Sequence, residues 1–389
     1  MDLCIRPGRL SGSVTPPPSK SMAHRVVLAQ MLSAHPGKTE NLSASQDILA
    51  TEGCVAALKA AQSGVLPHLD CGESGSTLRF LIPIALAMAG GGVFTGRGRL
   101  MERPQKPYFD IFDEKGISYG LTGGVLTIRG RLTPGVYRLP GNVSSQFVTG
   151  LLYALPLLEG DSEIVITSPL ESRGYVDMTV DTLTRFGVAV ENRHYERFLV
   201  PGNQRFQGRD AAIEADWSQA GFWYAAGFLG NPVELQGLDP ASAQGDRVAA
   251  ELCQQLAKPG DTDIDVSGCP DLLPPLAVMA AVRNGTTRFV NAARLRIKES
   301  DRLATVCAML TTLGGQAEEG PDSLTVRGVE KLSGGTVDGA NDHRIVMAAA
   351  IAATACAGPV TILGAEAVRK SYPTFWEEYD RLGGVTHVL

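Results

Sequence analysis

Six times along this chain, a short segment rich in Ser, Gly, Asp or Asn runs directly into an apolar stretch of helical length. The six segments are Ser19-Lys20-Ser21, Glu73 to Thr77, Asn142 to Gln146, Asp216-Trp217-Ser218, Cys269-Pro270-Asp271 and Asn341-Asp342-His343. They recur at intervals of roughly 55 to 75 residues, which is longer than a solenoid repeat and suits a small α/β unit. The repetition predicts six similar units in one chain.

Between these segments, the pattern predicts a second helix followed by two short strands. The clearest examples are residues 175–186 followed by 188–190 and 198–200, and residues 302–313 followed by 316–318 and 324–326. Apolar residues recur at helical intervals in the first part of each example and alternate with polar residues in the rest. The pair Gly314-Gly315 is typical of a helix end. We therefore expect the α/β class with mixed sheets.

The chain of 389 residues is longer than one hydrophobic core usually supports, so two domains are expected. An initial strand over residues 4–14 is followed by Pro16-Pro17-Pro18, where the chain can cross between domains. A return crossing near residues 211–216 leaves three units in each half. The predicted first lobe is residues 16–213, and the second is residues 1–15 plus 214–389.

Composition excludes several classes of protein. The hydrophobic fraction of 44% is ordinary, and no apolar run reaches membrane-spanning length. The N-terminal residues lack the pattern of a secretory signal, and the seven scattered cysteines include no CxxC pair. We therefore expect a cytoplasmic protein with reduced thiols and no membrane contact. The net charge of −6 gives no overall attraction for nucleic acid, so cations matter only where they concentrate locally.

Cations accompany several of the helix starts. Exposed backbone N–H groups and the helix dipole favour anions at a helix N-terminus, although any one Ser or Asp there is as easily an ordinary N-cap. Lys20 stands at a helix start and Arg25 follows about one and a half turns later. The apolar residues after Arg25 predict a buried helix whose charges need partners. Several such starts facing one cleft would suit a substrate that carries several phosphates or carboxylates.

The densest basic stretch lies between Gly96 and Pro107 and contains Arg97, Arg99 and Arg103. A solvated loop accounts for most of these charges. One arginine could still close over an anionic ligand, because a guanidinium binds carboxylate or phosphate through two hydrogen bonds.

The segment from Arg296 to Arg302 is charge-dense and leads into a helix. Lys298 and Arg302 are four residues apart, which predicts one shared helix face, and an exposed salt-bridged helix start is the alternative. Glu299 between cations is suited to proton transfer, while Lys298 could act as a general acid or as an anion clamp. Asp271 precedes an apolar stretch, where the pattern favours an N-cap over a catalytic group.

Together these residues resemble 5-enolpyruvylshikimate-3-phosphate synthases. The resemblance is carried by Pro18 to Arg25, Glu73 to Arg79, Val143 to Phe147, Lys298 to Arg302 and Asn341 to Arg344. The five motifs follow one another in order over nearly the whole chain, which makes the match specific.

The resemblance implies the two-domain enolpyruvyl transferase fold: six βαβαββ repeats, three per domain, with helices inside, sheets outside and the active site in the cleft between the domains. It implies transfer of the enolpyruvyl group of phosphoenolpyruvate to the 5-hydroxyl of shikimate-3-phosphate, through a tetrahedral intermediate and with release of phosphate. The substrates are two small molecules. No metal or organic cofactor is implied, and a monomer is expected. The presence of Gly75 implies sensitivity to glyphosate in competition with phosphoenolpyruvate.

The resemblance also assigns site residues by motif. The catalytic residues are Glu299 at the C3 proton, Asp271 at the 5-hydroxyl and Lys20 in an assisting role. Shikimate-3-phosphate is expected at Lys20, Ser21, Arg25, Ser144, Ser145, Gln146, Ser172, Tyr175, Asp271 and Lys298. Phosphoenolpyruvate is expected at Lys20, Gly75, Arg103, Gln146, Arg302, Arg344 and Lys370. Two positions depart from the family pattern: Glu73 and Arg294 stand where asparagine is found in many or some members.

Two other functions fit parts of the sequence. The sister enolpyruvyl transferases that act on UDP-N-acetylglucosamine use a cysteine on a mobile loop, but Gly96 to Pro107 contains no cysteine. A silent phosphosugar sensor on the same fold would need the cations but not both Asp271 and Glu299. Both alternatives are weaker than the transferase that forms 5-enolpyruvylshikimate-3-phosphate.

Overall fold

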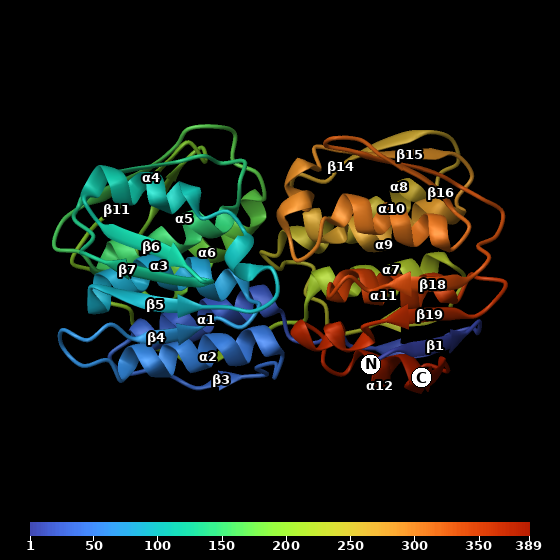
Figure 1. Cartoon of the computed structure of the whole chain (residues 1–389), viewed down its shortest axis with the longest axis horizontal. Helices are drawn as coiled ribbons and strands as arrows, with labels where there is room; N and C mark the ends of the chain where they lie inside the picture. The colour runs from blue at the N-terminus through green and yellow to red at the C-terminus, as the bar shows by residue number, and fades with distance from the viewer. The chain divides into compact units, whose positions relative to one another are not determined.

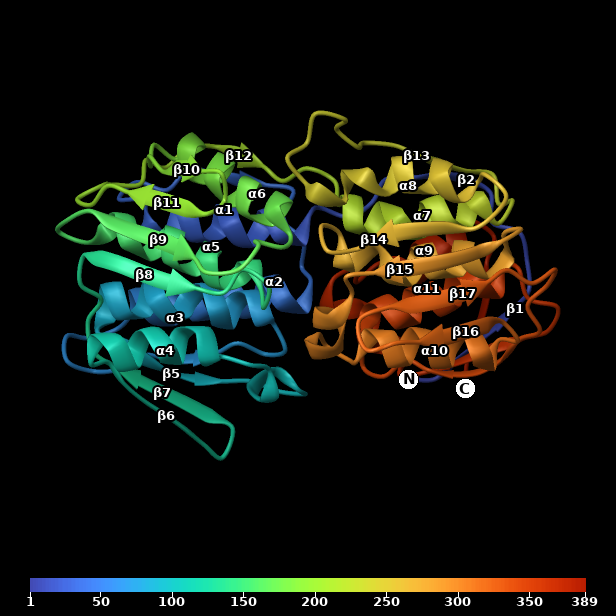
Figure 2. The same ribbon diagram turned by 90° about the horizontal axis from the view of Figure 1, so that it is seen from above.

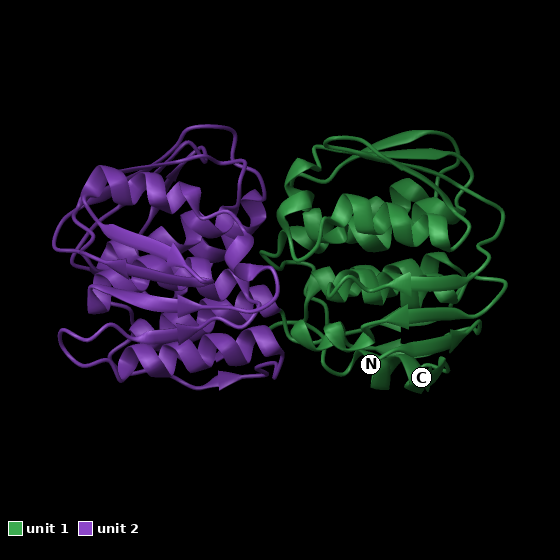
Figure 3. Ribbon diagram, in the orientation of Figure 1, with its two compact units in different colours: residues 1–19, 214–389 green, residues 20–213 purple.

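The computed structural model describes residues 1–389, which divide into two compact units (Figure 3). Unit 1 comprises Met1–Ser19 and Glu214–Leu389, and unit 2 comprises Lys20–Ile213. Both chain ends belong to unit 1, where the first strand pairs with the last strand of the chain.

Unit 2 contains six α-helices and three sheets. Its helices are α1 (Lys20–Leu32), α2 (Gln46–Lys59), α3 (Gly75–Ala89), α4 (Lys106–Lys115), α5 (Ser145–Ala154) and α6 (Arg173–Arg185). One sheet has the order β4 (His68–Asp70), β5 (Gly91–Thr95), β7 (Val125–Arg129), β6 (Ser118–Thr122). A second has the order β10 (Glu191–Arg193), β11 (Arg197–Val200), β9 (Ser162–Ile166), β8 (Gly135–Leu139), and its last three strands run side by side in Figure 2. The third is the pair β12 (Ala211–Ala212) and β3 (Thr39–Glu40).

Unit 1 repeats this plan. Its helices are α7 (Trp217–Phe228), α8 (Ala249–Leu256), α9 (Leu273–Val282), α10 (Arg302–Thr312), α11 (His343–Ala353) and α12 (Phe375–Arg381). One sheet has the order β18 (Gly335–Asp338), β19 (Val360–Leu363), β1 (Leu3–Arg6), β20 (Val385–Val388), of which the first three are seen together in Figure 1. A second has the order β14 (Thr262–Asp265), β15 (Thr286–Val290), β17 (Leu324–Arg327), β16 (Gln316–Glu319). The third is the pair β13 (Val233–Leu235) and β2 (Gly12–Val14).

The central helices are buried on every side. All residues of α11 are buried, and so are all residues of α9 except the last. In unit 2, α5 is buried at every position except Gln146. A helix that is apolar on all its faces has to lie inside a core, and the sheets then cover it from outside. The predicted arrangement of helices inside and sheets outside is therefore confirmed.

The six repeats are not all complete. In each unit, two sheets have four strands and the third has only two. Both short sheets are parallel pairs that join distant parts of the chain: β3 pairs with β12 in unit 2, and β2 pairs with β13 in unit 1. In unit 2 the short sheet thus joins the two ends of the unit, and in unit 1 it joins the two chain segments that make up the unit.

Two predicted strands are wrong in detail. Residues 188–190 form no strand, because the N–H of Val188 donates to Leu183 O at the end of α6 and the N–H of Ala189 donates to the Gln204 side chain. The predicted strand over residues 4–14 is split into β1 and β2, which join different sheets. Pro7 and Gly8 lie in the interruption and favour it, because proline cannot donate to a sheet and glycine weakens a strand.

None of the helices combines the length and the apolar character needed to cross a lipid bilayer.

Candidate active site

The six predicted helix starts all begin helices or helical turns, and four of them carry a side chain that caps the helix N-terminus. The side chains of Ser74, Ser144, Asp216 and Asp342 accept hydrogen bonds from the backbone of α3, α5, α7 and α11 respectively. Each cap satisfies a backbone N–H that the helix itself leaves without an acceptor. For these four residues, the ordinary structural interpretation holds whatever else they do.

Asp271 is different. It lies in the 3-10 helix η4 (Pro270–Leu272), directly before α9. Its carboxylate accepts hydrogen bonds from Arg302 Nη1 at 2.7 Å and from Arg344 Nη2 at 2.9 Å. Lys298 Nζ lies 3.6 Å from the same carboxylate. Although burial by itself would raise the pKa of Asp271, the three cations hold it well below its usual value. Asp271 is therefore an ionised group bound by cations, and the N-cap interpretation that the pattern favoured is wrong.

Arg302 is the centre of this cluster and is almost completely buried. Its Nε donates to Asp342 Oδ2 at 2.8 Å and its Nη2 donates to Glu299 Oε2 at 2.7 Å, in addition to the bond with Asp271. Burial opposes the charge of Arg302, but the carboxylates of Asp342, Glu299 and Asp271 raise its pKa well above the usual value. One guanidinium thus fixes the positions of three carboxylates.

Lys298 and Arg302 do not share a helix face, since Lys298 precedes α10 in extended backbone. They meet because both contact Asp271 Oδ1. Burial lowers the pKa of Lys298 to about 8, with Asp271 opposing the shift and Arg302 and Arg294 adding to it. Lys298 can therefore lose its proton near neutral pH, as a group that exchanges protons should.

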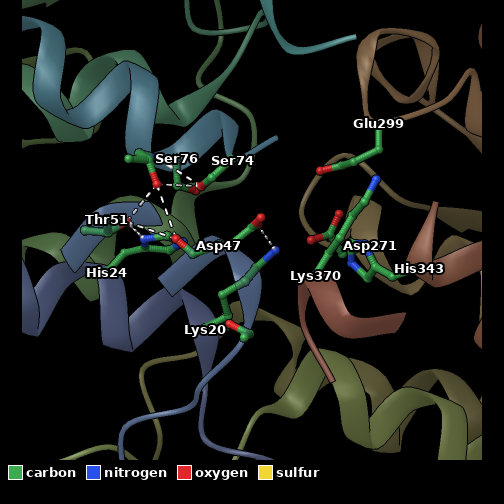
Figure 4. Close-up of polar contacts among 12 residues, drawn as sticks. Lys20, His24, Asp47, Thr51, Ser74, Ser76, Asp271, Glu299, His343 and Lys370 are labelled. Atoms are coloured by element: carbon green, nitrogen blue, oxygen red, sulfur yellow. Dashed lines mark hydrogen bonds and ion pairs between the residues drawn. The ribbon is translucent and has the colours of Figure 1, made fainter. Parts of the chain in front are cut away.

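Two further predicted residues lie beside this cluster, Arg344 at the start of α11 and Lys370 in a 3-10 helix that packs against α11. Arg344 contacts both the carboxylate and the backbone oxygen of Asp271. Lys370, in the 3-10 helix η6 (Ala365–Lys370), donates from Nζ to Asn341 O at 2.6 Å. Figure 4 shows Lys370 with Asp271, Glu299 and His343. Unit 1 therefore collects Asp271, Lys298, Glu299, Arg302, Arg344 and Lys370 from the starts of α9, α10 and α11 and from η6.

In unit 2, Lys20 is the first residue of α1, and its side chain is largely buried. Its Nζ donates to Asp47 Oδ2 at 2.8 Å, a contact drawn in Figure 4. Asp47 lies in the first turn of α2 and was not among the predicted site residues.

Arg25, one and a half turns further along α1, is buried and binds only uncharged oxygens through its three nitrogens. Nε donates to Thr179 Oγ1, Nη1 to Ser21 O and Nη2 to Tyr175 O, at 2.9, 2.6 and 2.7 Å. Burial lowers the pKa of Arg25 to about 10, which still leaves it protonated at neutral pH. These bonds bring Arg25, Ser21 and Tyr175 together, as the family resemblance implies.

Gly75 opens α3 and lies against the guanidinium of Arg103. A Cβ placed on Gly75 would be 2.6 Å from Arg103 Nη1, so any side chain at this position displaces that arginine. Arg103 is buried, whereas Arg97 and Arg99 in the same basic stretch are exposed. Of the arginines in that stretch, only Arg103 is held beside the predicted phosphoenolpyruvate glycine.

The start of α5 carries three predicted contacts of shikimate-3-phosphate. Ser144 is the N-cap, Ser145 is the first helical residue, and Gln146 follows. Gln146 accepts from Arg79 Nη1 at 2.8 Å and donates to Ser76 Oγ at 2.9 Å, which ties α5 to the start of α3. Ser172 lies directly before α6 with φ of +52°, a conformation that few residues other than glycine adopt.

Three structural partners in these clusters were missed by sequence reasoning: Asp47, Arg79 and Asp342. Arg79 and Asp342 lie within the motifs that carry the resemblance, but no role was assigned to them. For Asp47, the only local signal is an acidic residue in the first turn of a helix, which is explained equally well by the helix dipole.

Comparison with known proteins agrees with this geometry. A sequence model described as EPSP synthase (3-phosphoshikimate 1-carboxyvinyltransferase) matches residues 5–379. The chain belongs to the EPSP synthase family. The 3-phosphoshikimate 1-carboxyvinyltransferases of Clostridium acetobutylicum and Clostridium novyi are 45% and 43% identical to it, over 98% of this chain and 97% of each relative.

Solved structures confirm the fold. An EPSP synthase from Acinetobacter baumannii matches over the full length of both chains with a TM-score of 0.78 and 24% identity. The enolpyruvyl transferase NikO from Streptomyces tendae matches with a TM-score of 0.77 and 18% identity, over 99% of this chain and 98% of its own. The enolpyruvyl transferase fold predicted for this EPSP synthase family member is thus confirmed.

Proposed function

We propose that this chain transfers the enolpyruvyl group of phosphoenolpyruvate to the 5-hydroxyl of shikimate-3-phosphate and releases phosphate. The observation that carries the proposal is the cluster in which Asp271 and Glu299 are held by Arg302, with Lys298 and Arg344 against Asp271. Carboxylates for proton transfer, embedded among cations for anionic substrates, are what this reaction requires. Membership of the EPSP synthase family supports the same substrates.

The reaction has two steps. In the addition, the 5-hydroxyl oxygen bonds to C2 of phosphoenolpyruvate while the hydroxyl loses its proton and C3 gains one. In the elimination, C3 loses a proton and the bond from C2 to the phosphate oxygen breaks, which gives the enolpyruvyl product and inorganic phosphate. We assign the hydroxyl proton to Asp271 and the C3 proton to Glu299, with Lys20 assisting.

Substrate binding is assigned to residues of both units. Shikimate-3-phosphate is held at its phosphate by Ser144 and Ser145 at the start of α5, where backbone N–H groups and the helix dipole favour an anion. Its other contacts are Lys20, Ser21, Arg25, Gln146, Ser172, Tyr175, Asp271 and Lys298. Phosphoenolpyruvate is held by Lys20, Gly75, Arg103, Gln146, Arg302, Arg344 and Lys370. The cytoplasmic location and the monomeric state expected from the sequence stay predictions.

The proposal is tested by phosphate release from phosphoenolpyruvate, with shikimate-3-phosphate or UDP-N-acetylglucosamine as the acceptor. We expect turnover with shikimate-3-phosphate alone, and a loss of about 100- to 10,000-fold in the Glu299→Gln variant, the range for one acid–base group. Glu319→Gln is the matched control, because Glu319 also accepts from an arginine of this segment, Arg296, but is exposed.

Each other outcome identifies an alternative. Turnover with the nucleotide sugar would place the chain with the sister transferases. Tight binding of shikimate-3-phosphate without turnover would favour the sensor. Full activity in Glu299→Gln would remove Glu299 from the chemistry and leave the substrate assignment intact.

A further inference from the structure

A buried polar chain in unit 2 lies directly behind Lys20. His24 Nδ1 is 2.8 Å from Thr51 Oγ1, which is 2.7 Å from Thr77 Oγ1. Thr77 Oγ1 is in turn 2.7 Å from Ser74 Oγ, the N-cap of α3. All four side chains are fully buried. The chain therefore links α1, α2 and α3 at the ends where these helices carry Lys20, Asp47 and Gly75 (Figure 4).

The proton pattern of this chain is constrained. Burial, together with the charges of Lys20 and Arg25, lowers the pKa of His24 well below its usual value, so its ring is neutral. Nε2 of His24 has no hydrogen-bond partner, and the ring packs edge-on against Phe80. We assign the proton to Nδ1, which then donates to Thr51, because buried N–H groups without an acceptor are rarer in proteins than buried acceptors without a donor. The hydroxyl proton of Thr51 is then donated either to Thr77 Oγ1 or to the backbone oxygen of Asp47 in α2.

This series of hydrogen-bonded side chains fixes the first turn of α2, where Asp47 lies. Thr51 Oγ1 is 3.2 Å and Thr77 Oγ1 is 3.4 Å from Asp47 O, and the Asp47 carboxylate is 2.8 Å from Lys20 Nζ. The side chain of Asp47 is 11% exposed and that of Lys20 is 14% exposed, so both charges are largely removed from water. In such a setting an ion pair restricts the position of the lysine strongly.

We propose that Asp47 is a positioning residue for Lys20. The hydrogen-bonded side chains of His24, Thr51, Thr77 and Ser74 hold the backbone of Asp47 at a fixed position relative to the start of α3. The inference rests on the proposed function, because it gives Lys20 a task that requires accurate placement. A displacement of about 1 Å in a reacting group can cost about 100-fold in rate. Asp47 itself needs no contact with either substrate.

The primary test is the Asp47→Asn variant, which keeps the shape and removes the charge. We expect kcat to fall about 10- to 100-fold while KM for shikimate-3-phosphate changes less than about threefold, since the phosphate is held elsewhere. Asp47→Glu restores the carboxylate and should recover part of the rate. The matched control is Asp110→Asn on α4, which removes the partner of an exposed lysine, Lys106, in the same unit and should leave kcat unchanged.

A purely structural role gives a different pattern. If Asp47 only stabilises the positive end of α2, Asp47→Asn lowers the melting temperature but leaves kcat within twofold below that temperature. That result would overturn the proposal.

A double-mutant cycle tests whether Asp47 acts through Lys20. In a Lys20→Met background, adding Asp47→Asn should lower the residual rate less than about threefold, because the group it positions is gone. If the double variant instead lost the product of the two single losses, Asp47 would act independently of Lys20, and this result would also overturn the proposal.

The hydrogen-bonded side chains that hold Asp47 are tested by Thr51→Val. We expect a smaller loss in kcat of about 3- to 10-fold, with recovery in Thr51→Ser.

Crystal structures of the wild-type protein and Asp47→Asn give a readout that needs no turnover. We expect Lys20 Nζ to lie within hydrogen-bond distance of Asp47 in the first and to be displaced or spread over several positions in the second. An unmoved Lys20 would contradict the proposal. If the wild-type protein fails to use shikimate-3-phosphate, the proposed function fails, but these structures still decide the positioning role.

Discussion

Arg302 in unit 1 and Arg25 in unit 2 are both buried arginines in predicted substrate sites, but their surroundings are opposite. Arg302 donates to three carboxylates, which raise its pKa well above the usual value. Arg25 donates to one hydroxyl and two backbone oxygens, and burial lowers its pKa to about 10. The first charge is compensated locally, and the second is only solvated by dipoles.

The difference indicates a division of labour. A guanidinium that is neutralised by Asp271, Glu299 and Asp342 orients carboxylates, so its cluster is suited to proton transfer. A guanidinium held by neutral oxygens keeps its attraction for an anion, and fixed dipoles hold it without cancelling its charge. We therefore expect substitutions of the unit 1 carboxylates to act mainly on kcat, and substitutions at Arg25 or Gly75 in unit 2 to act mainly on KM.

The largest expected effect is that of Asp271→Asn, which removes the carboxylate shared by Arg302, Arg344 and Lys298. We expect kcat to fall about 100- to 10,000-fold, because the proposed proton acceptor for the 5-hydroxyl is lost. Stability should fall by about 3 to 5 kcal/mol, since cations are left buried without their partner. Steady-state kinetics and urea unfolding measure the two effects.

The control for Asp271 is Asp265→Asn. Asp265 lies in the same unit, but its carboxylate accepts from the uncharged Ser267 and Asn291. Loss of activity confined to Asp271→Asn would sharpen the contrast between the two arginines. A variant that keeps kcat and changes only KM would break it, because the unit 1 cluster would then serve binding.

Gly75→Ala is the corresponding change in unit 2. The added Cβ would lie 2.6 Å from Arg103 Nη1, so this buried arginine has to leave the position in which we propose that it binds phosphoenolpyruvate. We expect KM for phosphoenolpyruvate to rise about tenfold with kcat within threefold, the pattern for lost uniform binding. The wild-type protein should also be inhibited by glyphosate at millimolar levels or below, in competition with phosphoenolpyruvate.

Gly53→Ala controls for the backbone effect of replacing glycine. Gly53 lies within α2, and a Cβ there meets no atom within 4 Å. Alanine should therefore leave both kinetic constants unchanged and stabilise the protein by about 0.4 to 1 kcal/mol. If Gly75→Ala lowered kcat strongly and left KM unchanged, binding and chemistry would not separate as the comparison requires.

Much of the architecture could be predicted because its signals are local. Ser74, Ser144 and Asp342 are N-caps, and a capping residue before an apolar run predicts a helix start without knowledge of the tertiary structure. The continuous apolar sequences of α9 and α11 likewise announce buried helices.

The rest depends on packing between distant segments. Lys20 and Asp47 are 27 residues apart, and Arg302 and Asp342 are 40 residues apart. Nothing in either neighbourhood identifies the partner, since the pairs form only when separate helices pack together. The prediction that Lys298 and Arg302 share a helix face was wrong for a related reason. Helical spacing was applied to Lys298, which precedes the helix, and the two side chains meet instead at Asp271.

The expected effect that is smallest at neutral pH concerns the protonation of Lys298. Its pKa of about 8 reflects burial, which Asp271 opposes and Arg302 and Arg294 reinforce. Because kcat/KM reports the free protein, we expect kcat/KM for shikimate-3-phosphate to fall about tenfold per pH unit above pH 8, as the ammonium that we propose to contact this substrate is lost. The arginine in Lys298→Arg stays charged, so the pH at which kcat/KM begins to fall should rise by more than one unit.

Stability should respond to the same group with a definite sign. The folded-state pKa of about 8 is below the ordinary 10.5, so the charged lysine destabilises the fold below pH 8, and this penalty disappears as pH rises from 8 to 10.5. Urea unfolding of the wild-type protein should therefore show a contribution that increases over that range and is absent in Lys298→Arg. If the fall in kcat/KM above pH 8 were identical in the wild-type protein and Lys298→Arg, another group would cause that fall, and Lys298 would stay charged throughout. The unit 1 cluster would then differ from unit 2 in its carboxylates alone.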